Sequence, residues 1–172
     1  MKMPAAVQSA LNAQIKNELQ AHYNYLGMSV HFETTPYRGF ATWMRLQSTE
    51  EYGHAMKLYE YLVDRDAEVV LEAIDAPRTK FGPRPIEVFQ TSLTSEEEVT
   101  VQINNLYDLA QREKDFTTLH FLTWFLQEQV EEEHAVRLMV ERLELAGDNS
   151  AGLLRLDDEA ARRTAAQGQG RK

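Results

Sequence analysis

Residues 47–61, QSTEEYGHAMKLYEY, place a carboxylate and an imidazole where a buried helix face would ordinarily carry aliphatic side chains. Glu51 and His54 are three residues apart, so both point to the same side of an α-helix from successive turns. Their stripe repeats every three or four residues and comprises Phe40, Met44, Gln47, Glu51, His54, Leu58 and Tyr61. Burying a carboxylate is costly unless a cation compensates its charge. The segment therefore predicts a helix whose inward face carries charge for a purpose other than packing.

Three other segments of helical composition are interrupted in the same way. In the first, Glu18 lies seven residues before Tyr25, which puts both side chains on nearly the same helix face. In the third, Glu96 stands between apolar residues seven positions away on either side. The fourth carries Gln129 and Glu132 at two adjacent positions of its apolar stripe. The pattern predicts that carboxylates from four helices meet at one depth of a bundle.

Glycine and proline are scarce and clustered, which leaves long segments with helical apolar spacing. The expected helices cover residues 7–33, 37–66, 85–112, 116–146 and, as a short amphipathic fifth, 150–163, followed by a polar tail at 164–172. The second and third are separated by a proline-containing link that is long for a compact domain. A bundle with one long crossover explains it, because the link then travels the length of the bundle. We expect an all-α, single-domain four-helix bundle over residues 1–172.

Composition excludes several classes of site. The 172 residues contain no cysteine, so any metal must be bound by oxygen or imidazole ligands. The net charge of −9 argues against binding to a nucleic-acid backbone. No signal peptide or membrane-spanning run is evident, and we expect a soluble, cytoplasmic protein with neither nucleic acid nor membrane as a partner.

The predicted cluster has the chemistry of a metal site. Four carboxylates and one imidazole in a thiol-free interior favour iron or manganese over zinc or copper. A Glu-x-x-His pair is weak evidence by itself, and a second one, Glu131 with His134, lies off the core-facing stripe and is interpreted as accidental. We expect Glu97, Glu98 and Glu133 to be solvated. Sequence alone allows Tyr25 to be a core aromatic or a redox participant, and its spacing from Glu18 favours the second role.

Three motifs together resemble those of prokaryotic non-haem ferritins. They are Asn17-Glu18-Leu19, the run EEYGH at 50–54 and the run WFLQEQVEE at 124–132. The resemblance extends over essentially the whole chain, including the long crossover and the short fifth helix. It implies a first iron site formed by Glu18, Glu51 and His54, and a second one that shares Glu51 and is completed by Glu96 and Glu132. It further implies that Gln129 holds oxygen or water, that Tyr25 donates an electron, and that a third, weaker iron position is formed by Glu50, Glu128 and Glu131.

The same resemblance implies a function. It suggests a ferroxidase that oxidises Fe(II) with dioxygen or peroxide and stores a ferric oxyhydroxide mineral inside a shell of 24 identical subunits. Bacterioferritins, which bind haem, are also similar, but they have methionine directly after the bridging glutamate, where this chain has Tyr52. They also place a histidine three residues after the fourth-helix glutamate, where this chain has Ala135. We therefore expect no haem.

Three other functions share some of these features. One is a shell subunit without oxidase activity, but no proposed ligand is missing here. Another is a di-iron enzyme similar to rubrerythrin or to the small subunit of ribonucleotide reductase, but rubrerythrins usually add a cysteine-bound iron and the reductase subunit is far longer. The last is a DNA-protecting mini-ferritin, whose basic tail has a counterpart only in Arg171 and Lys172. Particle size separates a storage shell from a dimeric enzyme.

Overall fold

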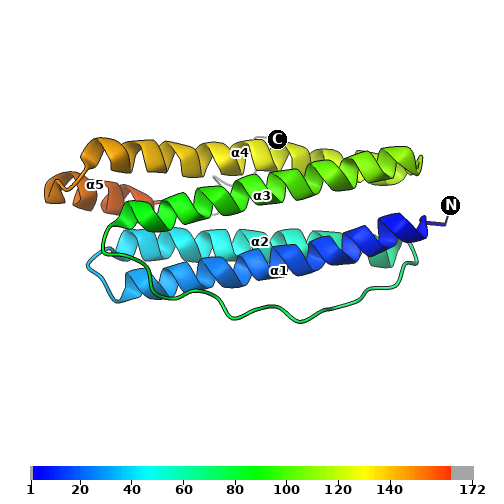
Figure 1. Cartoon of the computed structure of the whole chain (residues 1–172), viewed down its shortest axis with the longest axis horizontal. Coiled ribbons are helices and arrows are strands. Elements are labelled where there is room, and N and C mark those ends of the chain that lie inside the picture. Colours follow the sequence, from blue (N-terminus) through cyan, green and yellow to red (C-terminus); the bar gives the residue numbers. More distant parts are fainter. Residues whose placement is uncertain (1, 164–172) are drawn as a thin grey trace.

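A computed structural model describes residues 2–163, and the expected polar tail at 164–172 and its Arg171 and Lys172 lie outside this part. The described elements are the helices α1 (Ala5–Glu33), α2 (Arg38–Asp64), α3 (Pro85–Arg112), α4 (Phe116–Ala146) and α5 (Ser150–Ala161). Four long helices form the bundle and the short α5 packs at one end of it (Figure 1). This confirms the predicted fold class. Among residues 2–163, no helix is both long and apolar enough to cross a lipid bilayer.

The crossover makes α2 and α3 run in the same direction. Figure 1 shows residues 65–84 returning along the outside of the bundle from the end of α2 to the start of α3. A helix of 27 residues such as α2 is about 40 Å long, a span that an extended link of this size covers. Two side-chain amide groups of α1 hold the link by accepting hydrogen bonds from its backbone. Val70 N donates to Asn12 Oδ1 at 2.7 Å, and Asp75 N donates to Gln20 Oε1 at 2.6 Å.

The helix ends differ from the predicted ones in four places, one of which is the start of α2, at Arg38, one residue later than predicted. α1 begins two residues earlier than expected, at Ala5, because Pro4 has the extended conformation of a residue that precedes a helix. α2 ends at Asp64, two residues early, and Asp66 adopts a left-handed φ of 51° that a helix does not allow. α5 ends at Ala161 rather than at residue 163. The bounds of α3 and α4 agree with the prediction.

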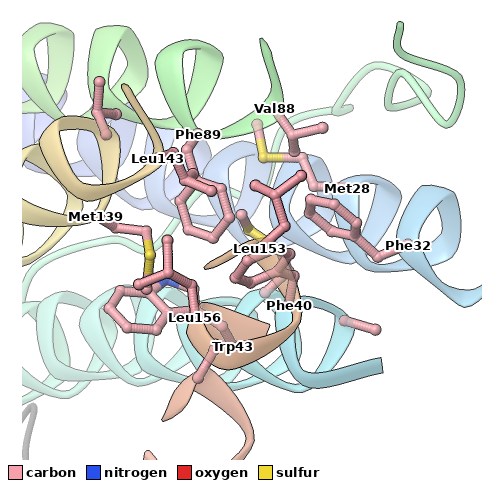
Figure 2. Packing of buried hydrophobic residues seen from close by; sticks show 14 of the residues in the cluster. Met28, Phe32, Phe40, Trp43, Val88, Phe89, Met139, Leu143, Leu153 and Leu156 are labelled. Carbon is pink, nitrogen blue, oxygen red and sulfur yellow. The ribbon is translucent and has the colours of Figure 1, made fainter. Parts of the chain in front are cut away.

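The apolar core is divided into two clusters, one at each end of the bundle. One cluster contains Ile15, Leu58 and Phe125 near the free end of α1. The other surrounds Phe40 and Phe89 and receives α5. Figure 2 shows the second cluster, whose labelled members are Met28, Phe32, Phe40, Trp43, Val88, Phe89, Met139, Leu143, Leu153 and Leu156. The polar residues of the four stripes lie between these two clusters.

A buried carboxylate fastens α5 to the beginning of α2. The first amides of a helix have no partner within it, and Phe40 N donates instead to Asp157 Oδ1 at 2.7 Å. Gly39 permits this approach, because a Cβ at that position would lie 1.8 Å from the carbonyl oxygen of Asp157. The docked α5 then runs along α2 toward the middle of the bundle.

Candidate metal centre

The central side chains are almost inaccessible to solvent. The exposed fractions are 0% for Glu18, 1% for Glu51, 1% for Glu96, 3% for Glu132 and 5% for His54. Each residue comes from the stripe that the sequence indicates, and together they represent α1, α2, α3 and α4. Apolar clusters on both sides of these side chains exclude water. The charges of the central carboxylates therefore interact strongly with one another.

Two groups of potential metal ligands share His54. Ligand atoms of Glu18, Glu51 and His54 lie within 4.8 Å of one another, and those of His54, Glu128 and Glu132 do the same. His54 Nδ1 is 3.2 Å from Glu51 Oε2. The imidazole is held by aromatic neighbours, among them the ring of Trp124, whose centroid lies 5.4 Å away in an edge-on arrangement. His54 therefore stands between two positions that each offer three ligands.

Glu96 belongs to neither of these groups, because its carboxylate has other partners. The hydroxyl of Tyr25 donates to Glu96 Oε1 and lies 2.8 Å from Ser92 Oγ. The amide of Gln129 donates to Glu96 Oε2 at 3.3 Å and to the backbone oxygen of Glu96 at 3.2 Å. Tyr25 and Gln129 thus lie beside the cluster and contact it through Glu96.

Three buried carboxylate oxygens in this region have no hydrogen-bond partner among residues 2–163. They are Glu18 Oε2, Glu132 Oε1 and Glu50 Oε1. A buried acceptor without a donor costs roughly 1–3 kcal/mol, and more when it is charged. These three oxygens lie in one interior region, and such a set of oxygen ligands is suited to coordinating a hard cation.

The pKa values of these groups reflect their crowding. Burial, followed by the negative charge of Glu51, raises the pKa of Glu18 to about 8. Burial and the charge of Glu132 raise the pKa of Glu96 to about 7. Burial and the charges of Glu96 and Glu132 raise the pKa of Glu51 well above its usual range. The metal-free centre therefore retains protons at neutral pH, and binding of a cation would release them.

The residues of the expected third position are less uniform. Glu128 is buried, and burial raises the pKa of its carboxyl group. Glu50 is half-buried and forms an ion pair with Arg163, with 3.0 Å between Oε2 and Nη2. Burial raises the pKa of Glu50 to about 7 even though the charge of Arg163 acts in the opposite direction. Glu131 is exposed on α4, outside the buried cluster, but its negative charge contributes to the raised pKa of Glu128.

The acidic neighbours and the second histidine are placed largely as expected. Glu97 and Glu98 are exposed, and so is His134. Glu133 differs, because it is half-buried and accepts a hydrogen bond from Thr100 Oγ1 at 2.5 Å. Thr100 and Glu133 both line a pocket between α3 and α4.

The contacts that support the central carboxylates are not identified in the sequence analysis. Gln14 Nε2 donates to Glu18 Oε1 at 2.8 Å, and Gln47 Nε2 donates to Glu132 Oε2 at 2.8 Å. Gln14 lies four residues before Glu18, and Ser92 lies four residues before Glu96, so their spacing on the polar stripes could have indicated them. Arg163 gave no such signal, because its role depends on how α5 docks.

The comparisons with known proteins agree with this geometry. Residues 8–146 match the family model described as ferritin-like domain. The bacterial non-heme ferritin of Staphylococcus saprophyticus is 39% identical over 155 residues, which cover 90% of this chain and 92% of that protein. The corresponding protein of Staphylococcus aureus is 38% identical, with 90% and 93% covered.

Solved structures of an archaeal protein are similar over nearly the whole fold. An open-pore ferritin of Archaeoglobus fulgidus superposes with a TM-score of 0.93 at 37% identity, covering 95% of this chain and 100% of that one. A form of the Archaeoglobus fulgidus ferritin engineered to be closed gives a TM-score of 0.92 at 38% identity, with 95% and 99% covered. With four central carboxylates on the expected helices and relatives of this similarity, the chain belongs to the ferritin family.

Proposed function

We propose that this protein is an iron-storing ferroxidase, which oxidises Fe(II) at the centre of each subunit and retains the ferric product inside a cage of identical subunits. The observation that carries the proposal is the buried set of four carboxylates and one imidazole, with unpartnered oxygens on Glu18 and Glu132. Such a set is unfavourable without a cation, and hard oxygen ligands favour Fe(III) over Fe(II).

The proposed ligands divide between two iron positions. Glu18, Glu51 and His54 hold the first ion, and Glu51 also reaches the second, which Glu96 and Glu132 complete. Glu96 serves this role when its bonds to Tyr25 and Gln129 rearrange, as a bound cation competes for its oxygens. Gln129 then positions oxygen or water, and Tyr25 donates an electron from its place beside Glu96.

The electrons and protons of the reaction balance without another protein. Two Fe(II) ions give up one electron each, and dioxygen accepts both electrons and two protons to form hydrogen peroxide. Peroxide as the oxidant accepts two electrons and two protons and yields two water molecules. The carboxyl groups of Glu18 and Glu96, whose pKa values are raised to about 8 and about 7, release protons when iron binds.

The finer features of storage are part of the same proposal. Glu50, Glu128 and Glu131 form a third, weaker iron position, and the product is deposited as a ferric oxyhydroxide mineral in a 24-subunit shell. The chain acts as one ferritin-like domain over residues 1–172, and it binds no haem because Tyr52 replaces the required methionine. Support comes from the family, since the two Archaeoglobus fulgidus ferritin structures cover 95% of this chain.

Rapid mixing of metal-free protein with Fe(II) in air, followed by absorbance, tests the assignment. We expect Glu51→Ala to slow oxidation about a hundredfold while the assembled particle keeps its size, because the ligand common to both iron positions is lost. Glu60→Ala is the matched control, since Glu60 is an exposed glutamate of the same helix. Oxidation by the Glu51 variant at the control's rate would refute the site and favour a shell subunit without oxidase activity.

A further inference from the structure

The positively charged side chain of Arg163 lies at the edge of the candidate metal centre. Arg163 lies two residues beyond the end of α5 at Ala161, and α5 is fastened to the start of α2 by Asp157. From there its side chain reaches residues in the middle of α2, and only 8% of it remains exposed. A guanidinium is seldom buried without partners, so its contacts indicate why it is there.

Each end of the Arg163 guanidinium meets an acceptor close to the iron ligands. Nη2 lies 3.0 Å from Glu50 Oε2, and Nη1 donates to Gln47 Oε1. The amide of Gln47 in turn donates to Glu132 Oε2 at 2.8 Å. One intervening side chain therefore separates Arg163 from a proposed ligand of the second iron.

The guanidinium of Arg163 also packs against the indole ring of Trp43. Arg163 Cζ lies 4.3 Å from the centroid of the Trp43 ring, a distance at which a cation is attracted to the aromatic face. The Arg163 side chain also lines a groove of about 320 Å³ between α4 and α5, together with His134 and Arg142. Arg163 thus lies between the groove and Glu50, and the groove gives it room to move away.

We propose that Arg163 is a tethered cation that occupies the third metal position at Glu50, so that iron binds there only by displacing the guanidinium into the groove. The inference rests on the proposed function, because it concerns the weaker site beside the two-iron centre. Arg163 holds only Glu50 Oε2, and its positive charge beside that oxygen opposes binding of a second cation at the unpartnered Oε1. Arg163 would then also be a positioning residue, since it orients Gln47 toward Glu132.

Anaerobic titration of assembled, metal-free, full-length protein with Fe(II) in a calorimeter tests the proposal. We expect two tight Fe(II) ions and one weak ion per subunit in the native protein. Arg163→Gln should tighten the third ion by about tenfold or more, because iron no longer displaces a charged hydrogen-bonded group. Arg163→Lys should restore weak binding, since it retains a cation on a long side chain.

Two controls separate this effect from a general loss of charge or of α5 docking. Arg142→Gln removes an arginine from the same groove, one paired with Glu159 rather than Glu50, and should leave all three affinities unchanged. Adding Glu50→Gln to Arg163→Gln should abolish the gain. A crystal of the Arg163→Gln protein soaked in Fe(II) should show the third ion beside Glu50.

The outcomes also distinguish this inference from the function on which it rests. Tight binding of two ions in all variants, with a third ion that Arg163→Gln leaves as weak as in the native protein, overturns the role of Arg163 alone. Absence of the two tight ions from native protein overturns the proposed function and the inference with it. Tightening that persists in the double variant also refutes the inference, because Glu50 would then not be the ligand.

Discussion

Tyr25 can be separated from the other aromatic residues of the core by what its hydroxyl contacts. It is 1% exposed and donates to Glu96, and burial together with the negative charge of Glu96 raises its pKa well above the usual range. The phenol therefore stays protonated at neutral pH and can give up its proton only together with an electron. These properties match an electron donor beside the proposed second iron position.

Tyr25→Phe tests that role with little change in packing. We expect the variant to bind two Fe(II) ions per subunit as before but to oxidise them about tenfold more slowly, because the phenol is lost and Glu96 loses a hydrogen bond. Stopped-flow absorbance measures the rate and anaerobic titration the binding. Tyr23→Phe is the control, since Tyr23 is 37% exposed on the same helix. Equal rates for the two variants would leave Tyr25 as a core residue.

The raised carboxyl pKa values give the metal-free protein an unusual pH dependence. The pKa of Glu18 is about 8 in the folded protein, against an ordinary value of 4.5. Between these values the folded state holds a proton that the unfolded state has lost, so stability falls as pH rises. This loss is complete once the pH exceeds the folded pKa.

Replacing Glu18 by glutamine removes this titration while keeping a polar group next to Gln14. We expect the thermal midpoint of metal-free Glu18→Gln to exceed that of the native protein by at least several degrees at pH 8, and to approach it at pH 5. Calorimetry across this range provides the measurement, with Glu60→Gln as the exposed control. Parallel curves for the native protein and the Glu18 variant would contradict the pKa assignment.

The sequence could predict which residues meet at the centre but not how they are supported. Glu18, Glu51 and Glu132 interrupt regular apolar stripes, and helical periodicity alone places them on inward faces. Their role as iron ligands stays a prediction. Gln47 was recognised as a stripe residue, yet its bond to Glu132 spans 85 positions and depends on the relative heights of two helices. The contact between Arg163 and Glu50 depends on tertiary docking in the same way.

At the level of helices, a boundary could be predicted from the sequence where residues close to it in the chain determine it. α3 begins at Pro85, a residue suited to the first turn of a helix, and α4 begins after Asp115, whose side chain accepts a hydrogen bond from Thr118 N at 3.2 Å. The predicted end of α2 was two residues too late, because Asp66 has a positive φ of 51°, and Arg65 at the C-cap pairs with Asp115 at 3.3 Å. That partner is 50 residues away and gives no local signal.

The docking of α5 rests on one glycine of α2. Gly39→Ala would drive a methyl group into the backbone of Asp157, so we expect α5 to shift and the protein to lose about 1–3 kcal/mol of stability. Gly53→Ala in the same helix meets no atom within 4 Å and should stabilise by about 0.5–1 kcal/mol. Thermal unfolding of the two metal-free variants gives the comparison. A Gly39 variant as stable as the Gly53 variant would show that α5 is not fixed by this contact.

At the scale of the whole molecule, the α1–α2 pair presents more apolar surface than an isolated subunit needs. Tyr52 is 48% exposed, Tyr59 38% and Val63 50%, and all three lie on one face of α2. Leu26 and Val30 are also exposed on α1, at 37% and 46%. Figure 1 shows these two helices side by side. Several exposed apolar side chains on one helix pair of a folded protein often mark a surface that another subunit covers.

If subunits of the cage meet through this face, one buried charge should prevent assembly without unfolding the subunit. We expect Leu26→Glu and Tyr59→Glu to shift the protein from a very large particle to monomers or dimers, because an unpaired carboxylate in an apolar interface costs several kcal/mol. Size-exclusion chromatography with light scattering gives the mass, and circular dichroism confirms that the helices persist. Leu26→Met, which preserves volume and polarity, should assemble normally. Particles of native size from both glutamate variants would place the subunit contacts on another face of the bundle.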